Sequence, residues 1–163
     1  MKSRYSAIVL AVCLVCALPP RVAGAQAHLS KTKSNSSGNA IPQAAQLAPS
    51  ELMQQLSISP KPLVLQVGSH VLYAQAHIPA SEYVGAAGSP AGAQALRDRV
   101  KNLPKDQLLV IYCGCCPWDR CPNIGAAYQQ LQSLGFTHVK ALYLANNFGD
   151  DWVNKGYPVE KGR

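Results

Sequence analysis

The chain has 163 residues, with 15 Lys and Arg against 8 Asp and Glu, for a formal net charge of +7. Three of the basic residues fall within the first 21, and the others are scattered, with no stripe and no interleaved aromatic residues. A nucleic-acid surface needs a denser basic patch, so we expect no nucleic-acid partner and read the charge as an ordinary surface.

The N-terminus has the pattern of a secretory signal peptide. Lys2 and Arg4 precede an apolar run over residues 7–18, and the small residues 23–25 follow. The run is too short for an ordinary membrane span. We therefore expect residues 1–25 to be cleaved and the mature protein to be exported, periplasmic or secreted, with no stable membrane span. An uncleaved anchor is the alternative.

Residues 26–46 are polar and small, and such a stretch buries too little apolar surface to order itself. We expect a flexible tether there. Residues 47–163 then have the length of one domain.

Helical and strand-like patterns alternate along this domain. The first half predicts a helix over residues 49–56, a buried strand over 63–67, and a second helix that opens at Ser89 and Pro90. The second half predicts a strand over 108–112, a helix over 123–134 ended by Gly135, a strand over 139–144 and a short helix over 147–155.

This alternation predicts an α/β fold of three layers, with a mostly parallel central sheet and helices on both faces. The strands read as continuous apolar runs, which is typical of strands buried on both sides. Ligands of such sheets bind beyond the carboxyl ends of the strands. Cys113 follows the strand at 108–112 and therefore lies at that edge.

Four cysteines remain after the signal peptide, all within nine residues: Cys113, Cys115, Cys116 and Cys121. Disulfides that stabilise a fold usually close long loops, because long loops lose more entropy on closure. Four thiols in one loop tie no distant segments together. The cluster therefore indicates chemistry, a metal site or a locally braced loop.

The cysteine loop joins a strand to a helix, so backbone N–H groups and the helix dipole favour negative charge within it. Arg120 could add a full positive charge there. Both effects favour a thiolate, the form of cysteine that attacks sulfur or binds metal. We expect Cys113, at the strand end, to be the most acidic and reactive of the four.

Five segments follow one another along the domain: the strand at 62–67, Ala76-His77-Ile78-Pro79 with the next two residues, the strand leading to Cys113, the helix exit at 134–139, and Trp152 with the tail at 156–159. Taken in this order, they resemble the rhodanese-like family. The likeness extends over nearly all of the domain.

The resemblance implies a parallel five-stranded sheet flanked by helices, and transfer of sulfane sulfur through a cysteine persulfide. Cys113 would be the nucleophile. Cys115 is its rival, because Arg120 follows Cys115 at the family's spacing. The expected partners are a small sulfur donor and a thiol or other thiophilic acceptor, with no cofactor.

Two alternatives remain open from the residues. Cys-x-Cys-Cys-x4-Cys offers enough thiolates for zinc or a soft copper ion, which would make the chain a binding module without turnover. The loop could instead be braced by a disulfide, Cys116–Cys121 or Cys113–Cys121, since adjacent cysteines join only with strain. A catalytically silent domain would then present the loop to a protein partner.

Overall fold

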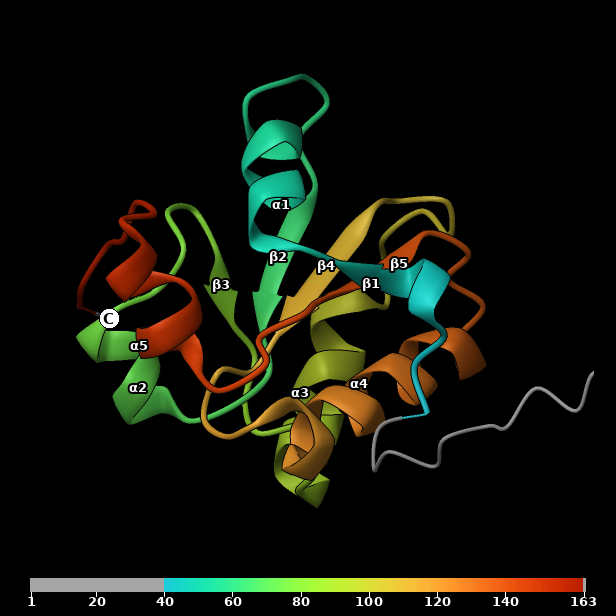
Figure 1. The fold of residues 1–163 in the computed structure, drawn as a ribbon. Helices are drawn as coiled ribbons and strands as arrows, with labels where there is room; N and C mark the ends of the chain where they lie inside the picture. Colours follow the sequence, from blue (N-terminus) through green and yellow to red (C-terminus); the bar gives the residue numbers. More distant parts are fainter. Residues whose placement is uncertain (1–39, 163) are drawn as a thin grey trace, which may run out of the picture. The chain divides into compact units, whose positions relative to one another are not determined.

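A five-stranded, all-parallel sheet forms the centre of the fold (Figure 1). The computed structural model describes residues 40–162. The strands lie in the order β1-β5-β4-β2-β3. Their bounds are β1 Gln46–Leu47, β2 Leu63–Gln66, β3 Glu82–Tyr83, β4 Leu109–Tyr112 and β5 Val139–Leu142. The predicted α/β fold with a mostly parallel sheet is confirmed.

The helices are α1 Pro49–Leu56, α2 His70–Gln75, α3 Pro90–Val100, α4 Pro122–Ser133 and α5 Phe148–Asp151, with short 3-10 turns at Gln43–Ala45, Trp118–Arg120 and Val153–Lys155. Ser89 caps α3 as predicted, because its hydroxyl accepts a hydrogen bond from the Gly92 N–H at 3.1 Å. The predicted last helix is two pieces, since the backbone leaves helical geometry at Trp152. None of the helices between residues 40 and 162 has the length and apolarity to cross a membrane.

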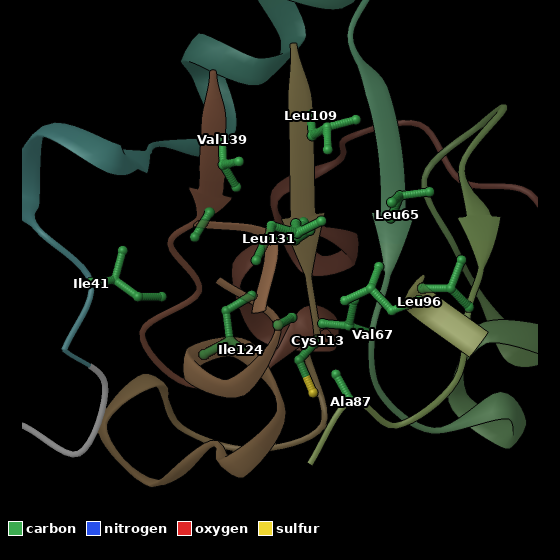
Figure 2. Packing of buried hydrophobic residues seen from close by; sticks show 14 of the residues in the cluster. Ile41, Leu65, Val67, Ala87, Leu96, Leu109, Cys113, Ile124, Leu131 and Val139 are labelled. Atoms are coloured by element: carbon green, nitrogen blue, oxygen red, sulfur yellow. The ribbon is translucent and has the colours of Figure 1, made fainter. Parts of the chain in front are cut away.

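Each face of the sheet carries its own hydrophobic core, because successive strand residues point to opposite faces. Leu65 and Ile111 point to the face that α3 and α4 cover, where they pack with Leu96 and Leu131 (Figure 2). The other face carries a second cluster, with α1 and α5 packed over β2, β4 and β5. Its members include Leu52, Val64, Val110, Phe148 and Trp152.

Part of the predicted tether belongs to the fold. Ile41 is only 6% exposed and packs in the first core cluster, and Gln46–Leu47 form β1 along β5. The predicted boundary at residue 47 is therefore too late, because backbone pairing and one buried isoleucine order this segment. The predicted signal peptide at 1–25, and the tether up to residue 39, lie outside the described residues.

Three elements have no counterpart in the sequence prediction: β1, β3 and α2. The two strands are two residues each, which is too short for an alternating pattern to show. Helix α2 is six residues long and buries only Tyr73, so it has no apolar stripe. All three are held by their neighbours in the fold.

Trp152 is the largest fully buried side chain, and it fixes the C-terminal segment to the cysteine loop. Its Nε1 donates to the Pro158 carbonyl at 2.9 Å, and its ring stacks on Phe148. The Phe148 N–H in turn donates to the Gly114 carbonyl at 3.0 Å. Gly114 has φ of +73°, and a Cβ there would lie 2.6 Å from the Phe148 Cβ, so this contact requires glycine.

Candidate active site

The cysteine loop starts where β4 ends, at the carboxyl edge of the sheet. Cys113 is 5% exposed, and the loop after β2 packs directly against it. A Cβ on Gly68 would lie 2.7 Å from the Cys113 sulfur, so only glycine fits at that position without displacing the cysteine. The predicted place of Cys113, at the end of the central strand, is therefore confirmed.

Three sulfurs of the loop converge. The Sγ atoms of Cys113, Cys115 and Cys121 all lie within 4.8 Å of one another, and those of Cys113 and Cys115 are 3.0 Å apart. Cys116 lies beside this group, with its sulfur 3.2 Å from that of Cys115. The four thiols are not bonded to one another. The loop thus folds back on itself and brings Cys121 to the end of β4.

Asn123 holds the sulfurs from the start of α4. It is 8% exposed, and its side-chain oxygen accepts the Gly88 N–H at 2.9 Å. A backbone N–H can only donate, so this bond turns the Asn123 amide nitrogen towards the cysteines. That nitrogen donates to Cys113 Sγ at 3.4 Å and lies 3.8 Å from Cys115 Sγ. From the sequence, Asn123 was expected only to begin a helix.

Gln66, at the end of β2, holds the backbone of the same loop. Its side-chain nitrogen donates to the Cys113 carbonyl at 3.2 Å, and its oxygen accepts the Gly68 N–H at 3.1 Å. The side chain is 2% exposed, so these two bonds satisfy a polar group that would otherwise be costly to bury. Gln66 therefore ties the loop after β2 to the start of the cysteine loop.

The helix N-terminus favours a negative charge at Cys121, which directly precedes α4. The Cys113 thiol donates a hydrogen bond to Cys121, and the N–H groups of Ile124 and Asn123 also face its sulfur; together they lower the pKa of Cys121 to about 5. The same hydrogen bond, with burial, raises the pKa of Cys113. The helix N-terminus, one of the reasons to expect Cys113 to be the most acidic thiol, lies at Cys121 instead.

This arrangement predicts that the reduced protein keeps one thiolate down to mildly acidic pH. The ultraviolet absorbance of the thiolate should disappear as the pH falls through about 5, the apparent pKa of the cluster at Cys121. Cys121→Ser should move this transition to the range of ordinary thiols, while Cys116→Ser should leave it in place. A transition that stays near pH 5 in Cys121→Ser would place the charge on another sulfur.

The same shift makes stability depend on pH. Because the pKa of Cys121 is lower in the folded chain, its contribution to stability is full above the unfolded value of 9.0 and is lost as the pH falls to about 5. The raised pKa of Cys113 acts in the opposite sense only at alkaline pH. Between about pH 6 and about pH 8, the free energy of unfolding should therefore rise more steeply in the wild type than in Cys121→Ser.

A cavity of about 320 Å³ opens on one side of the loop, between α2 and α5. Cys115 is partly exposed and lines the cavity, as does Gly114. Cys113 and Cys121 are buried and do not line it. The walls include Leu72, Ala76 and Phe148. The cavity lining includes no charged side chain from residues 40–162. Cys115 is thus the sulfur of the cluster that a ligand in this cavity would meet.

Arg120, a candidate site residue, lies on the 3-10 turn Trp118–Arg120 and is exposed. Within the described chain, no hydrogen bond or ion pair joins it to the cysteines. The buried Trp118 of the same turn packs its ring against Tyr143, at 5.0 Å between centroids. The structure thus brings together Cys113, Cys115 and Cys121, keeps Cys116 beside them, and leaves Arg120 at the surface.

Solved structures with this fold share it at low sequence identity. The crystal structure of the Alr3790 protein from Anabaena sp. matches at 23% identity with a TM-score of 0.54, over 71% of this chain and 92% of that one. The solution structure of the rhodanese-like domain of the Anabaena protein matches at 22%, with a TM-score of 0.53, over 72% and 79% of the two chains. The BH2092 protein from Bacillus halodurans matches at 21%, with a TM-score of 0.55, over 71% and 76%.

No protein-family model and no curated protein matches the sequence. The likeness to solved structures concerns the fold, and it confirms the expected one: the chain has a rhodanese-like fold.

Proposed function

We propose that this domain is a sulfurtransferase that accepts sulfane sulfur on Cys115 as a persulfide. The observation that carries the proposal is the position of Cys115, which faces an open cavity on one side and two further sulfurs on the other. Cys113, the first candidate from the sequence, is 5% exposed and is enclosed by Gly68 and Asn123. The rival candidate, Cys115, is the better acceptor on these grounds.

The chemistry needs Cys115 to attack as a thiolate. Cys115 is partly exposed and lines the cavity, so its proton can leave to solvent. The Cys115 thiolate then attacks the outer sulfur of a donor persulfide, the sulfur–sulfur bond of the donor breaks, and the donor leaves as a thiolate. That thiolate takes up a proton from solvent. Cys113 and Asn123 serve as donors of hydrogen bonds that keep the cluster in place.

The cavity favours the apolar alkyl group of an organic persulfide over a wholly inorganic anion such as thiosulfate. Its walls are apolar, with the amide side chains of Gln75 and Asn147 as the polar groups. Asn147 donates a hydrogen bond to the Asp150 carboxylate at 2.7 Å, so a negative charge lies next to this part of the cavity lining. An anion would lose its hydration there and gain no cation in return.

A soft metal ion is the second candidate for the same cluster. Thiolates around one zinc ion lie about 3.8 Å apart, as follows from zinc–sulfur bonds of about 2.3 Å in a tetrahedron. Three sulfurs within 4.8 Å of one another approach that spacing without large movement. Under this alternative the loop binds zinc or Cu(I) and cleaves no donor.

A single-turnover measurement separates the two candidates. The reduced chain is mixed with an equal amount of a small alkyl persulfide, and the released alkyl thiol is followed with time. The proposal predicts one alkyl thiol released for each chain, and a much slower reaction with thiosulfate. Metal content of the same preparation is measured with and without added zinc. Retention of metal with no release of alkyl thiol, before or after metal removal, would favour the binding module.

A further inference from the structure

We propose that Cys121 resolves the persulfide formed on Cys115, which makes the domain a persulfide reductase that releases hydrosulfide. This inference rests on the proposed function and adds a second step to it. The Cys121 sulfur attacks the Sγ atom of Cys115, and a Cys115–Cys121 disulfide forms. The outer sulfur then leaves into the cavity instead of passing to an acceptor thiol.

The two sides of the loop support this direction of attack. Gly114 and Cys115 line the cavity between α2 and α5, and Cys113 and Cys121 do not. Cys113, Cys116 and Cys121 instead line a second, very small pocket, which shares Gly114 with the cavity and which Cys115 does not line. A donor therefore reaches Cys115 from the cavity and leaves its sulfur on that side. The buried sulfurs of Cys113 and Cys121 lie within 4.8 Å of the inner atom, Sγ of Cys115.

Such a placement matches the geometry of thiol–disulfide exchange. The attacking sulfur approaches one sulfur of the bond from the side opposite to the leaving sulfur. Cys121 is buried and does not line the cavity, so we place its attack on the side of Cys115 Sγ away from the outer sulfur. The distance of at most 4.8 Å between Cys115 and Cys121 has to shorten to the length of a disulfide bond.

Among the neighbouring thiols, Cys121 fits the resolving role best. Its sulfur precedes the twelve-residue helix α4, where free N–H groups favour a negatively charged sulfur. The sulfur of Cys113 lies 3.0 Å from that of Cys115, but the Cys121 side chain and burial raise the pKa of Cys113, so it holds a proton instead of attacking. Cys116 is adjacent to Cys115 in sequence, and adjacent cysteines form a disulfide only with strain.

The step balances without any group from outside the protein. Cys115 carries S–SH and Cys121 is a thiolate; the product is a disulfide and HS⁻, so the charge is unchanged. The outer sulfur is reduced to sulfide, and the two cysteines are oxidised by the same two electrons. A further cycle requires an external dithiol, which reduces the disulfide by exchange. A single turnover needs no such reductant.

The test is one turnover of the reduced full chain, freed of reductant and oxygen, with an equal amount of a small alkyl persulfide. Hydrosulfide is captured with a fluorescent trap, and the cysteine peptides are mapped by mass spectrometry. The wild type should release one hydrosulfide for each alkyl thiol and acquire a Cys115–Cys121 disulfide. Cys121→Ser should still release alkyl thiol but keep the additional sulfur on Cys115, with hydrosulfide reduced at least about tenfold. Cys116→Ser is the matched control and should behave as the wild type.

The wild-type result alone is decisive even where Cys121→Ser folds poorly. Release of alkyl thiol with a persulfide retained on the wild type, and no disulfide, would overturn the resolving step and leave the proposed function standing. A disulfide that joins Cys115 to Cys113 would overturn the assignment to Cys121. No release of alkyl thiol by the wild type would overturn the proposed function and the resolving step together.

Discussion

Cys115→Ser is expected to abolish uptake of sulfane sulfur, with the rate of alkyl thiol release lowered roughly a thousandfold or more, as for other deletions of a nucleophile. Serine has nearly the shape of cysteine, but its hydroxyl does not attack sulfur at neutral pH. The cavity and the other three cysteines stay in place. Stopped-flow measurement of alkyl thiol release checks this.

Cys116→Ser is the matched control, because Cys116 is the neighbouring residue and is also partly exposed. It should take up sulfur at a rate close to that of the wild type. Unchanged uptake in Cys115→Ser, together with lost uptake in Cys113→Ser, would return the role of nucleophile to Cys113, the first expectation from the sequence. Urea unfolding of each variant separates loss of the nucleophile from loss of the fold.

Trp152→Ala is expected to destabilise the domain by about 3–5 kcal/mol, the usual cost of removing a large buried aromatic side chain. Trp152 is fully buried, stacks on Phe148 and lies 4.8 Å from the Tyr157 ring, so nothing near it can fill the space. This is a large part of the stability of an ordinary domain. The midpoint of urea unfolding, with its slope, gives the change in free energy.

Val153→Ala serves as the control in the same segment, because Val153 is 37% exposed. This substitution should lower the free energy of unfolding by about 0.5 kcal/mol or slightly more. A loss of under about 1 kcal/mol in Trp152→Ala would show that the C-terminal segment contributes little to the stability of the fold. Phe148 would then be held mainly by its bond to Gly114.

The elements that carry the site could be predicted because their patterns are long or strongly apolar. The run at 108–112 reads as a buried strand, and the structure has β4 there, with Cys113 at its carboxyl end. The helix after the cysteines begins at Pro122, within one residue of the prediction. Ser89 as a helix cap followed from residue type alone.

The contacts within the site could not be predicted, because they depend on how the loop folds back. The sequence places Cys121 eight positions after Cys113, yet their sulfurs meet within 4.8 Å. The spacing to Cys115 suggested Arg120 as an anion-binding residue, but a 3-10 turn leaves it exposed. The amide of Asn123 acquires its role from Gly88, a residue 35 positions earlier. A local sequence pattern cannot predict a hydrogen-bond partner that lies so far away in the chain.

The order of the strands sets when the thiols become protected during synthesis. β1 pairs with β5, with Gln46 opposite Ala141, so the first strand of the described fold gains its partner only after the last strand has been made. All four cysteines of the loop leave the ribosome before β5 does. Pairing between segments so distant in sequence forms slowly. A newly made chain therefore carries its four thiols before the C-terminal third, which includes the contact of Phe148 with Gly114, can complete the fold around them.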